Sequence, residues 1–98
     1  MRDGLEILQN LCNSYGVSGD ETRTRDIILK EISPFVSGLK VDNLGNIIAF
    51  KKGKCTPKKK IMISAHMDEV GFIVTYITDD GLLKFNTVGG INSNVVCG

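Results

Sequence analysis

Residues 61–69 read IMISAHMDE, and this stretch decides both the fold class and the candidate site. Its first five residues are apolar or small and follow three lysines, a pattern typical of a strand that is buried on both faces. We therefore expect a strand at 61–65, with His66 directly after it and Asp68 two residues later. Because positions two apart in extended backbone point the same way, these two side chains are expected to share a face.

A histidine and a carboxylate at the end of a buried strand form a candidate metal site. Open α/β sheets place ligand-binding groups at the carboxyl ends of their strands. Neutral imidazole is a good zinc ligand, and a neighbouring carboxylate orients the ring and raises its basicity. The pair His66 and Asp68 has this chemistry. The pattern by itself also fits a structural histidine, which is the commoner use of a lone histidine at a strand end.

Two helices are expected before this strand. Asp3 and Glu6 have the spacing of a capping box, so the first helix is expected to begin there. Its apolar residues recur at helical spacing: Leu5, Leu8, Leu11 and Cys12. A second capping box is expected at 18–21, and Pro34 is expected to end or kink the helix that follows. Its apolar stripe is formed by Ile28, Ile32 and Phe35.

After Gly38 the pattern changes from helical to extended. Turn residues at 43–46 and 79–81 each separate two short apolar runs, which is typical of β-hairpins. Strands are expected at 39–41, 47–50, 70–77 and 82–85. The predicted fold class is therefore α/β, with two helices packed on a small, mostly buried sheet that runs into the first strands of an antiparallel β module.

Composition excludes several classes of function. The chain has 98 residues with 12 Lys and Arg against 11 Asp and Glu, which argues against a general nucleic-acid or membrane-surface binder. No apolar run approaches the roughly 20 residues of a membrane helix. Three cysteines without a Cys-x-x-Cys pair are interpreted as reduced thiols. We expect a cytoplasmic protein with no nucleic-acid and no membrane partner.

Four motifs follow one another along the chain, at 16–19 with Glu21 and Arg25, at 41–47, at 64–72, and at Asp80-Gly81 with Phe85 and 88–90. In this order and spacing they resemble the amino-terminal part of the tetrahedral, dinuclear metallo-aminopeptidases. These are the glutamyl/leucyl aminopeptidases, family 42 of the metallopeptidases, whose members often carry the label endoglucanase or cellulase homologue. Together they run along nearly the whole chain.

The resemblance implies a partial three-layer metallopeptidase domain at 1–71 and the incomplete start of the inserted, oligomerising β domain at 72–98. It implies that His66 is a metal ligand and that Asp68 is the catalytic-site carboxylate that orients it, while Glu69 is not a ligand. The family holds two divalent ions, zinc or cobalt, cleaves amino-terminal residues from peptides and forms homo-oligomers. Its other ligands and its glutamate base lie further along the chain, so these 98 residues are expected to be inactive alone and not to retain the metal ions.

Two alternatives remain open at this stage. The first is a non-catalytic, truncated chain that folds or associates only with partners, as the apolar end at 94–98 suggests. The second is a carbohydrate hydrolase that uses Asp68 or Glu69. Glycosidases need a pair of carboxylates, one on each side of the glycosidic bond. The side chains of Asp68 and Glu69, which are adjacent at one strand end, are expected to diverge, and the chain has no Trp to stack on a sugar.

Overall fold

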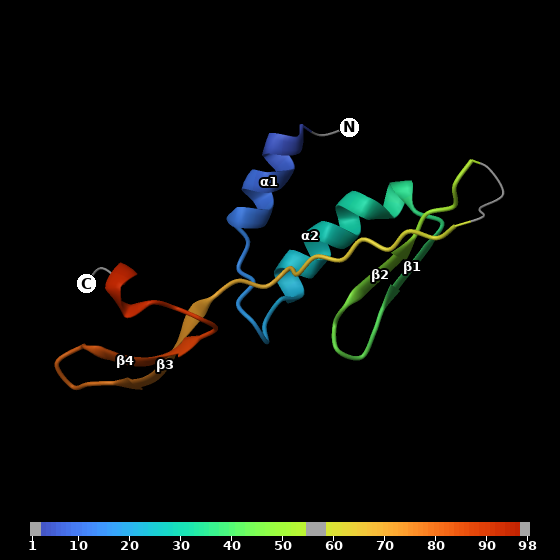
Figure 1. Cartoon of the computed structure of the whole chain (residues 1–98). Helices are drawn as coiled ribbons and strands as arrows, with labels where there is room; N and C mark the ends of the chain where they lie inside the picture. Colours follow the sequence, from blue (N-terminus) through green and yellow to red (C-terminus); the bar gives the residue numbers. More distant parts are fainter. Residues whose placement is uncertain (1–2, 55–58, 97–98) are drawn as a thin grey trace.

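The computed structural model describes residues 3–54 and 59–96. Figure 1 shows its elements, which are α1 (Gly4–Cys12), α2 (Thr22–Ile32), the short 3-10 helix η1 (Ser33–Phe35), β1 (Gly38–Val41), β2 (Ile47–Phe50), β3 (Gly71–Ile77), β4 (Leu83–Val88) and the 3-10 helix η2 (Ser93–Val95). Strands β1 and β2 form one antiparallel sheet, and β3 and β4 form another. The expected α/β class is confirmed.

The helix ends confirm two predictions and correct one. Asp3 is the N-cap of α1, and its side chain accepts a hydrogen bond from the amide of Leu5 at 3.4 Å. Helix α2 ends before Pro34, which lies in η1 because its ring cannot continue an α-helix. The second capping box is wrong, because α2 begins only at Thr22 and the hydroxyl of Ser18 donates to Asp68 instead.

The turn between β1 and β2 is organised by Asp42. Its carboxylate accepts hydrogen bonds from the amides of Leu44 and Asn46 and from the side-chain amide of Asn46, each at 2.9 Å. Gly45 has a φ of 86°, which a side chain rarely adopts. The carbonyl of Gly45 accepts from the guanidinium of Arg25 at 3.2 Å, so the hairpin is tied to α2.

The Asp42 carboxyl is expected to titrate below the 3.8 of an unperturbed carboxyl. Its pKa is lowered because Asn46 donates to the ionised form, first with its side chain and then with its backbone amide. The carboxylate therefore stabilises the turn fully above pH 3.8, and this contribution is lost as the pH falls through the lower pKa of the folded state. A ¹³C titration of the carboxyl carbon checks this, with Asn46→Ala expected to move the midpoint upward. A midpoint at or above 3.8 in the unmodified chain would contradict the prediction.

The second hairpin pairs Gly71 with Val88 at one end and Ile77 with Leu83 at the other. The rings of Phe72 and Phe85 meet edge to face on it, with centroids 4.7 Å apart. The predicted turn at 79–81 is confirmed, with Gly81 at a φ of 86°. Both hairpins thus follow from local turn chemistry and from cross-strand packing.

The expected strand at 61–65 is wrong. Ile61, Met62 and Ile63 are 89%, 90% and 91% exposed and belong to no sheet. In Figure 1 this segment runs extended (yellow) from the β1–β2 hairpin toward β3. An open groove of about 500 Å³ separates it from α2 and β2. A buried strand needs neighbours for its backbone amides and carbonyls, and the described part of the chain offers it none.

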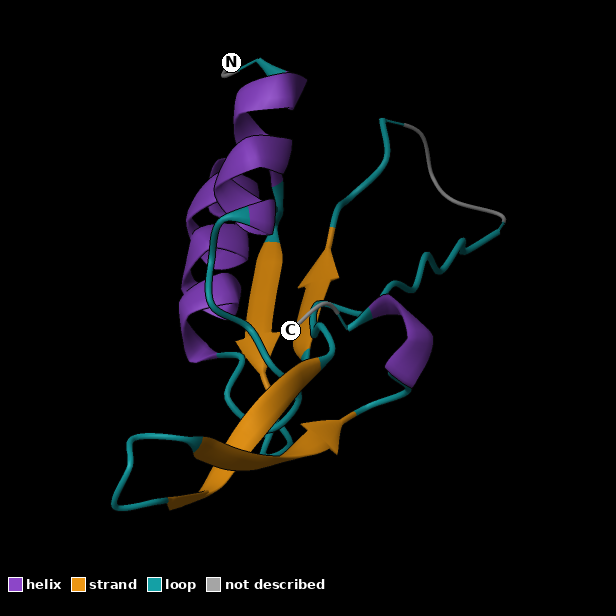
Figure 2. Ribbon diagram, turned by 90° about the vertical axis from the view of Figure 1, so that its left-hand side faces the viewer, coloured by secondary structure: helices purple, strands orange, loops and turns teal. Residues whose placement is uncertain are grey.

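The expected burial of the sheet is also wrong. Within residues 3–54 and 59–96 no apolar side chain is buried, and only Gly16 and Thr24 are classed as buried. The radius of gyration is 18.3 Å, against about 13 Å for a compact chain of this length. Figure 2 shows the open arrangement, with the β3–β4 hairpin extending away from the helices. Among the described residues, no helix has the length and apolar character needed to cross a bilayer.

Candidate functional site

The site forms where the loop after α1 meets the segment that follows His66. Val17 and Glu69 make an isolated parallel bridge. The amide of Ser18 donates to the carbonyl of Glu69 at 3.2 Å, and the amide of Glu69 donates to the carbonyl of Gly16 at 2.9 Å. The Glu69 carboxylate also accepts from the amide of Gly16 at 3.3 Å. Glu69 therefore holds the loop with both its backbone and its side chain.

Two glycines allow this close approach. A Cβ at Gly71 would lie 2.6 Å from a methyl group of Val17, and a Cβ at Gly16 would overlap the hydroxyl of Thr24. Thr24 lies on α2, is 5% exposed, and shares a 2.7 Å hydrogen bond with Ser14. The loop is thus packed between α2 and the start of β3 with no room for a side chain at either glycine.

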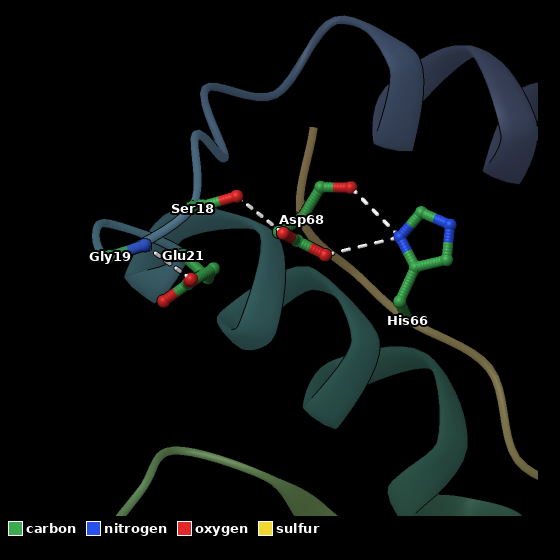
Figure 3. A network of polar contacts seen from close by, with 5 residues as sticks. All are labelled: Ser18, Gly19, Glu21, His66 and Asp68. Atoms are coloured by element: carbon green, nitrogen blue, oxygen red, sulfur yellow. Dashed lines mark hydrogen bonds and ion pairs between the residues drawn. The ribbon is translucent and has the colours of Figure 1, made fainter. Parts of the chain in front are cut away.

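The functional side chains form a short chain of hydrogen bonds, drawn in Figure 3. The hydroxyl of Ser18 donates to Oδ2 of Asp68 at 2.5 Å, and Oδ1 of Asp68 lies 3.1 Å from Nδ1 of His66. The backbone carbonyl of Asp68 lies 3.0 Å from the same nitrogen. The pKa of the Asp68 carboxyl is lowered, chiefly because the Ser18 hydroxyl donates to it and further by His66. The expected meeting of His66 and Asp68 is confirmed.

The imidazole presents one nitrogen to the protein and the other to solvent. Nδ1 faces two oxygen acceptors, so the proton of the neutral ring belongs on Nδ1. This leaves the lone pair of Nε2 available. The His66 side chain is 85% exposed and that of Asp68 is 40% exposed, so this lone pair is accessible. A neutral ring oriented by a carboxylate is the usual state of a histidine that binds a metal.

These donors fit one ligand of a metal centre with its orienting carboxylate. A hydrolytic zinc site has about three protein ligands, whereas no three His, Cys, Asp or Glu side chains converge among the residues that the structure describes. The glycosidase alternative receives no support from this geometry. Asp68 is engaged by Ser18 and His66, while Glu69 is engaged by Gly16.

Ser18 belongs to this site, although no local pattern in the sequence indicates it. Its position before a run with helical spacing suggested a helix cap, and nothing local indicates that its hydroxyl reaches a carboxylate 50 residues later. The signal that marks it is its place in the 16–19 motif, directly after Gly16, which cannot carry a side chain, and Val17, which makes the parallel bridge.

Residues 45–98 match the family model described as M42 glutamyl aminopeptidase. A lysyl aminopeptidase of Pyrococcus furiosus is 37% identical over 87 residues, which are 88% of this chain and 24% of that protein. A TET aminopeptidase of a marine sediment Thaumarchaeota archaeon superposes with a TM-score of 0.84 at 37% identity, over 96% of this chain and 26% of that one. The dodecamer structure of PhTET1-12s superposes with a TM-score of 0.75 at 40% identity, over 93% of this chain and 27% of that one. The chain thus spans about a quarter of the length of the curated relatives that it matches.

Proposed function

The chain belongs to the M42 family of glutamyl aminopeptidases, and on this basis we propose that it supplies the first ligand of a metal-dependent aminopeptidase. The reaction is the release of amino-terminal residues from peptides by water activated at a two-metal centre. The observation that carries the proposal is the exposed Nε2 of His66, whose other nitrogen is held by Asp68. Histidines that bind a metal usually have their other ring nitrogen held by a carboxylate or a backbone carbonyl in this way.

Each residue has a separate task in this proposal. His66 would hold a divalent ion, zinc or cobalt, through Nε2. Asp68 orients the ring and keeps its proton on Nδ1, and Glu69 fixes the loop that carries Ser18. The bound ions would supply Lewis acidity and a water of lowered pKa. The remaining ligands and the general base are proposed to come from outside the described residues, so these 98 residues alone are expected to be inactive.

The wider setting is part of the same proposal. Peptides are the substrates, and the assembly is a homo-oligomer, which the dodecamer of PhTET1-12s supports by likeness. We also propose a cytoplasmic location. The near-neutral charge of the chain favours the absence of a nucleic-acid or membrane partner. We also divide it at residue 71, where β3 begins, into a catalytic part at 1–71 and a β module at 72–98.

A chimera tests the function directly. This chain replaces the matching segment of the Thaumarchaeota TET aminopeptidase, to whose backbone it is closely similar. We expect the zinc- or cobalt-loaded chimera to hydrolyse an aminoacyl anilide but no β-glucan, and the 98-residue chain alone to hydrolyse neither. A folded, metal-loaded chimera without peptidase activity would favour the non-catalytic alternative. Hydrolysis of β-glucan would instead favour the carbohydrate hydrolase.

Asp68→Asn in this chimera is expected to weaken metal binding by about 10- to 100-fold, the usual cost of losing a carboxylate that orients a ligand. His66→Ala is expected to weaken it further, because it removes the ligand itself. Equilibrium competition with a chelator measures both. Asp79→Asn, in the β3–β4 turn, is the control and should leave the affinity unchanged. Equal affinities in all three variants would contradict the assignment of both residues.

A further inference from the structure

We propose that Ser18 is a positioning residue of this site, which acts through Asp68 to keep the proton of the neutral His66 ring on Nδ1. The inference rests on the proposed function for its purpose, because a proton on Nδ1 is what frees Nε2 for a metal. Its physical content lies in a contact between the loop after α1 and the segment at 66–69, two parts of the chain that are 50 residues apart. It concerns residues that the structure describes and needs no bound ion to be tested.

The direction of the Ser18 hydrogen bond follows from the chemistry of its partners. A carboxylate only accepts, so the hydroxyl proton of Ser18 points at Oδ2 of Asp68. The Asp68 side chain is 40% exposed, and water competes for both of its oxygens. With Oδ2 fixed by Ser18, the rotation of the carboxylate is restricted and Oδ1 is directed at Nδ1 of His66. Charge-assisted hydrogen bonds of this kind are the stronger ones in proteins.

The hydroxyl is itself held by the backbone around it. The amide of Ser18 donates to Glu69, and the neighbouring Gly16 bonds Glu69 through both its carbonyl and its amide. A Cβ at Gly71 would not fit against Val17, so this contact fixes the loop from the other side. Ser18 is thus positioned by backbone hydrogen bonds on one side and by close packing on the other. This is the kind of support that a precise site requires.

The backbone carbonyl of Asp68 limits the size of the expected effect. It lies 3.0 Å from Nδ1 of His66 and remains as an acceptor when the carboxylate rotates away. Loss of the Ser18 hydroxyl should therefore shift the two neutral tautomers of the ring only partly toward the form with its proton on Nε2. Asp68→Ala keeps the same carbonyl but removes the carboxylate. The change in tautomer ratio in this variant is therefore the largest change that loss of the carboxylate contact can produce.

The single histidine of the sequence makes the readout unambiguous. The ¹⁵N shifts of its two ring nitrogens, at alkaline pH and without metal, give the tautomer ratio of His66 in the 98-residue chain. Ser18→Ala, which removes the hydroxyl, is expected to shift the ratio toward the Asp68→Ala value. Ser18→Thr keeps the hydroxyl and is expected to preserve the ratio. Ser37→Ala removes a hydroxyl that bonds Phe50 and Lys52 and is the matched control.

Two results would overturn the inference. The first is an unchanged ratio in Ser18→Ala. The second is a tautomer ratio in the unmodified, folded chain that equals the ratio measured in urea, since the fold would then have no influence on the ring. This comparison needs no variant, so it still tests the inference if the Ser18 variants unfold and lose the dispersion of their amide signals. Because no metal is present, failure of the proposed function is separate: a chimera that lacks peptidase activity while its His66 ratio responds to Ser18 would overturn only the function.

Discussion

A Gly16→Val variant is expected to separate the loop after α1 from the segment that carries His66. Any Cβ at this position overlaps the hydroxyl of Thr24, which is almost fully buried and hydrogen-bonded to Ser14. Overpacking of this kind typically costs about 1–3 kcal/mol, and we expect the upper end because valine is β-branched and Thr24 has little space into which to move. The amide and carbonyl of Gly16 both bond Glu69, so a displaced loop loses the whole bridge.

Hydrogen exchange at the amides of Ser18 and Glu69 measures this loss. Both amides donate across the bridge, so they should be protected in the unmodified chain and exchange freely in Gly16→Val. Gly90→Val is the matched control, because no atom lies within 4 Å of a Cβ built there. Protection at Ser18 that survives in Gly16→Val would show that the loop accommodates a side chain and that the close packing against Thr24 is not needed.

The features that the sequence predicts correctly depend on neighbours within a few residues. The turn at 43–46 forms because Asp42 accepts from residues two and four positions later. Pro34 ends α2 because its ring excludes the next helical turn. The contact of His66 with Asp68 follows from the two-residue period of extended backbone. Each of these structures depends on interactions that short stretches of sequence contain.

The incorrect predictions depend on distant partners. An apolar run such as 61–65 indicates that its side chains favour burial, but it does not show which segment covers them. In this structure Ile61 and Ile63 are almost completely exposed. Serine is a common helix N-cap, but its hydroxyl can bond to several different backbone and side-chain partners. Here a carboxylate 50 residues later takes the hydrogen bond, and no local pattern contains that information.

The 98-residue chain, purified by itself, is expected to self-associate through the unpaired segment at 61–63. Ile61 and Ile63 are 89% and 91% exposed, and the described backbone around them joins no sheet. Such a segment pairs readily with a second chain, because pairing satisfies its amides and carbonyls and also buries its side chains. Burial of each isoleucine is worth about 1.5–3 kcal/mol, so removing two from an interface costs at least about 3 kcal/mol, or roughly a 100-fold weaker association.

The double variant Ile61→Lys with Ile63→Lys tests this surface, because the two positions share one face of the extended segment and the added charges repel in a paired strand. Light scattering over a series of concentrations should show the unmodified chain as a dimer or larger and the double variant as a monomer. Leu44→Lys is the control, since Leu44 is 88% exposed but lies in the β1–β2 turn, away from the unpaired backbone. A monomeric unmodified chain at every concentration would refute the association. If Leu44→Lys weakened the association as much as the double variant, loss of exposed apolar area would explain the result. Pairing of residues 61–63 would then not be supported.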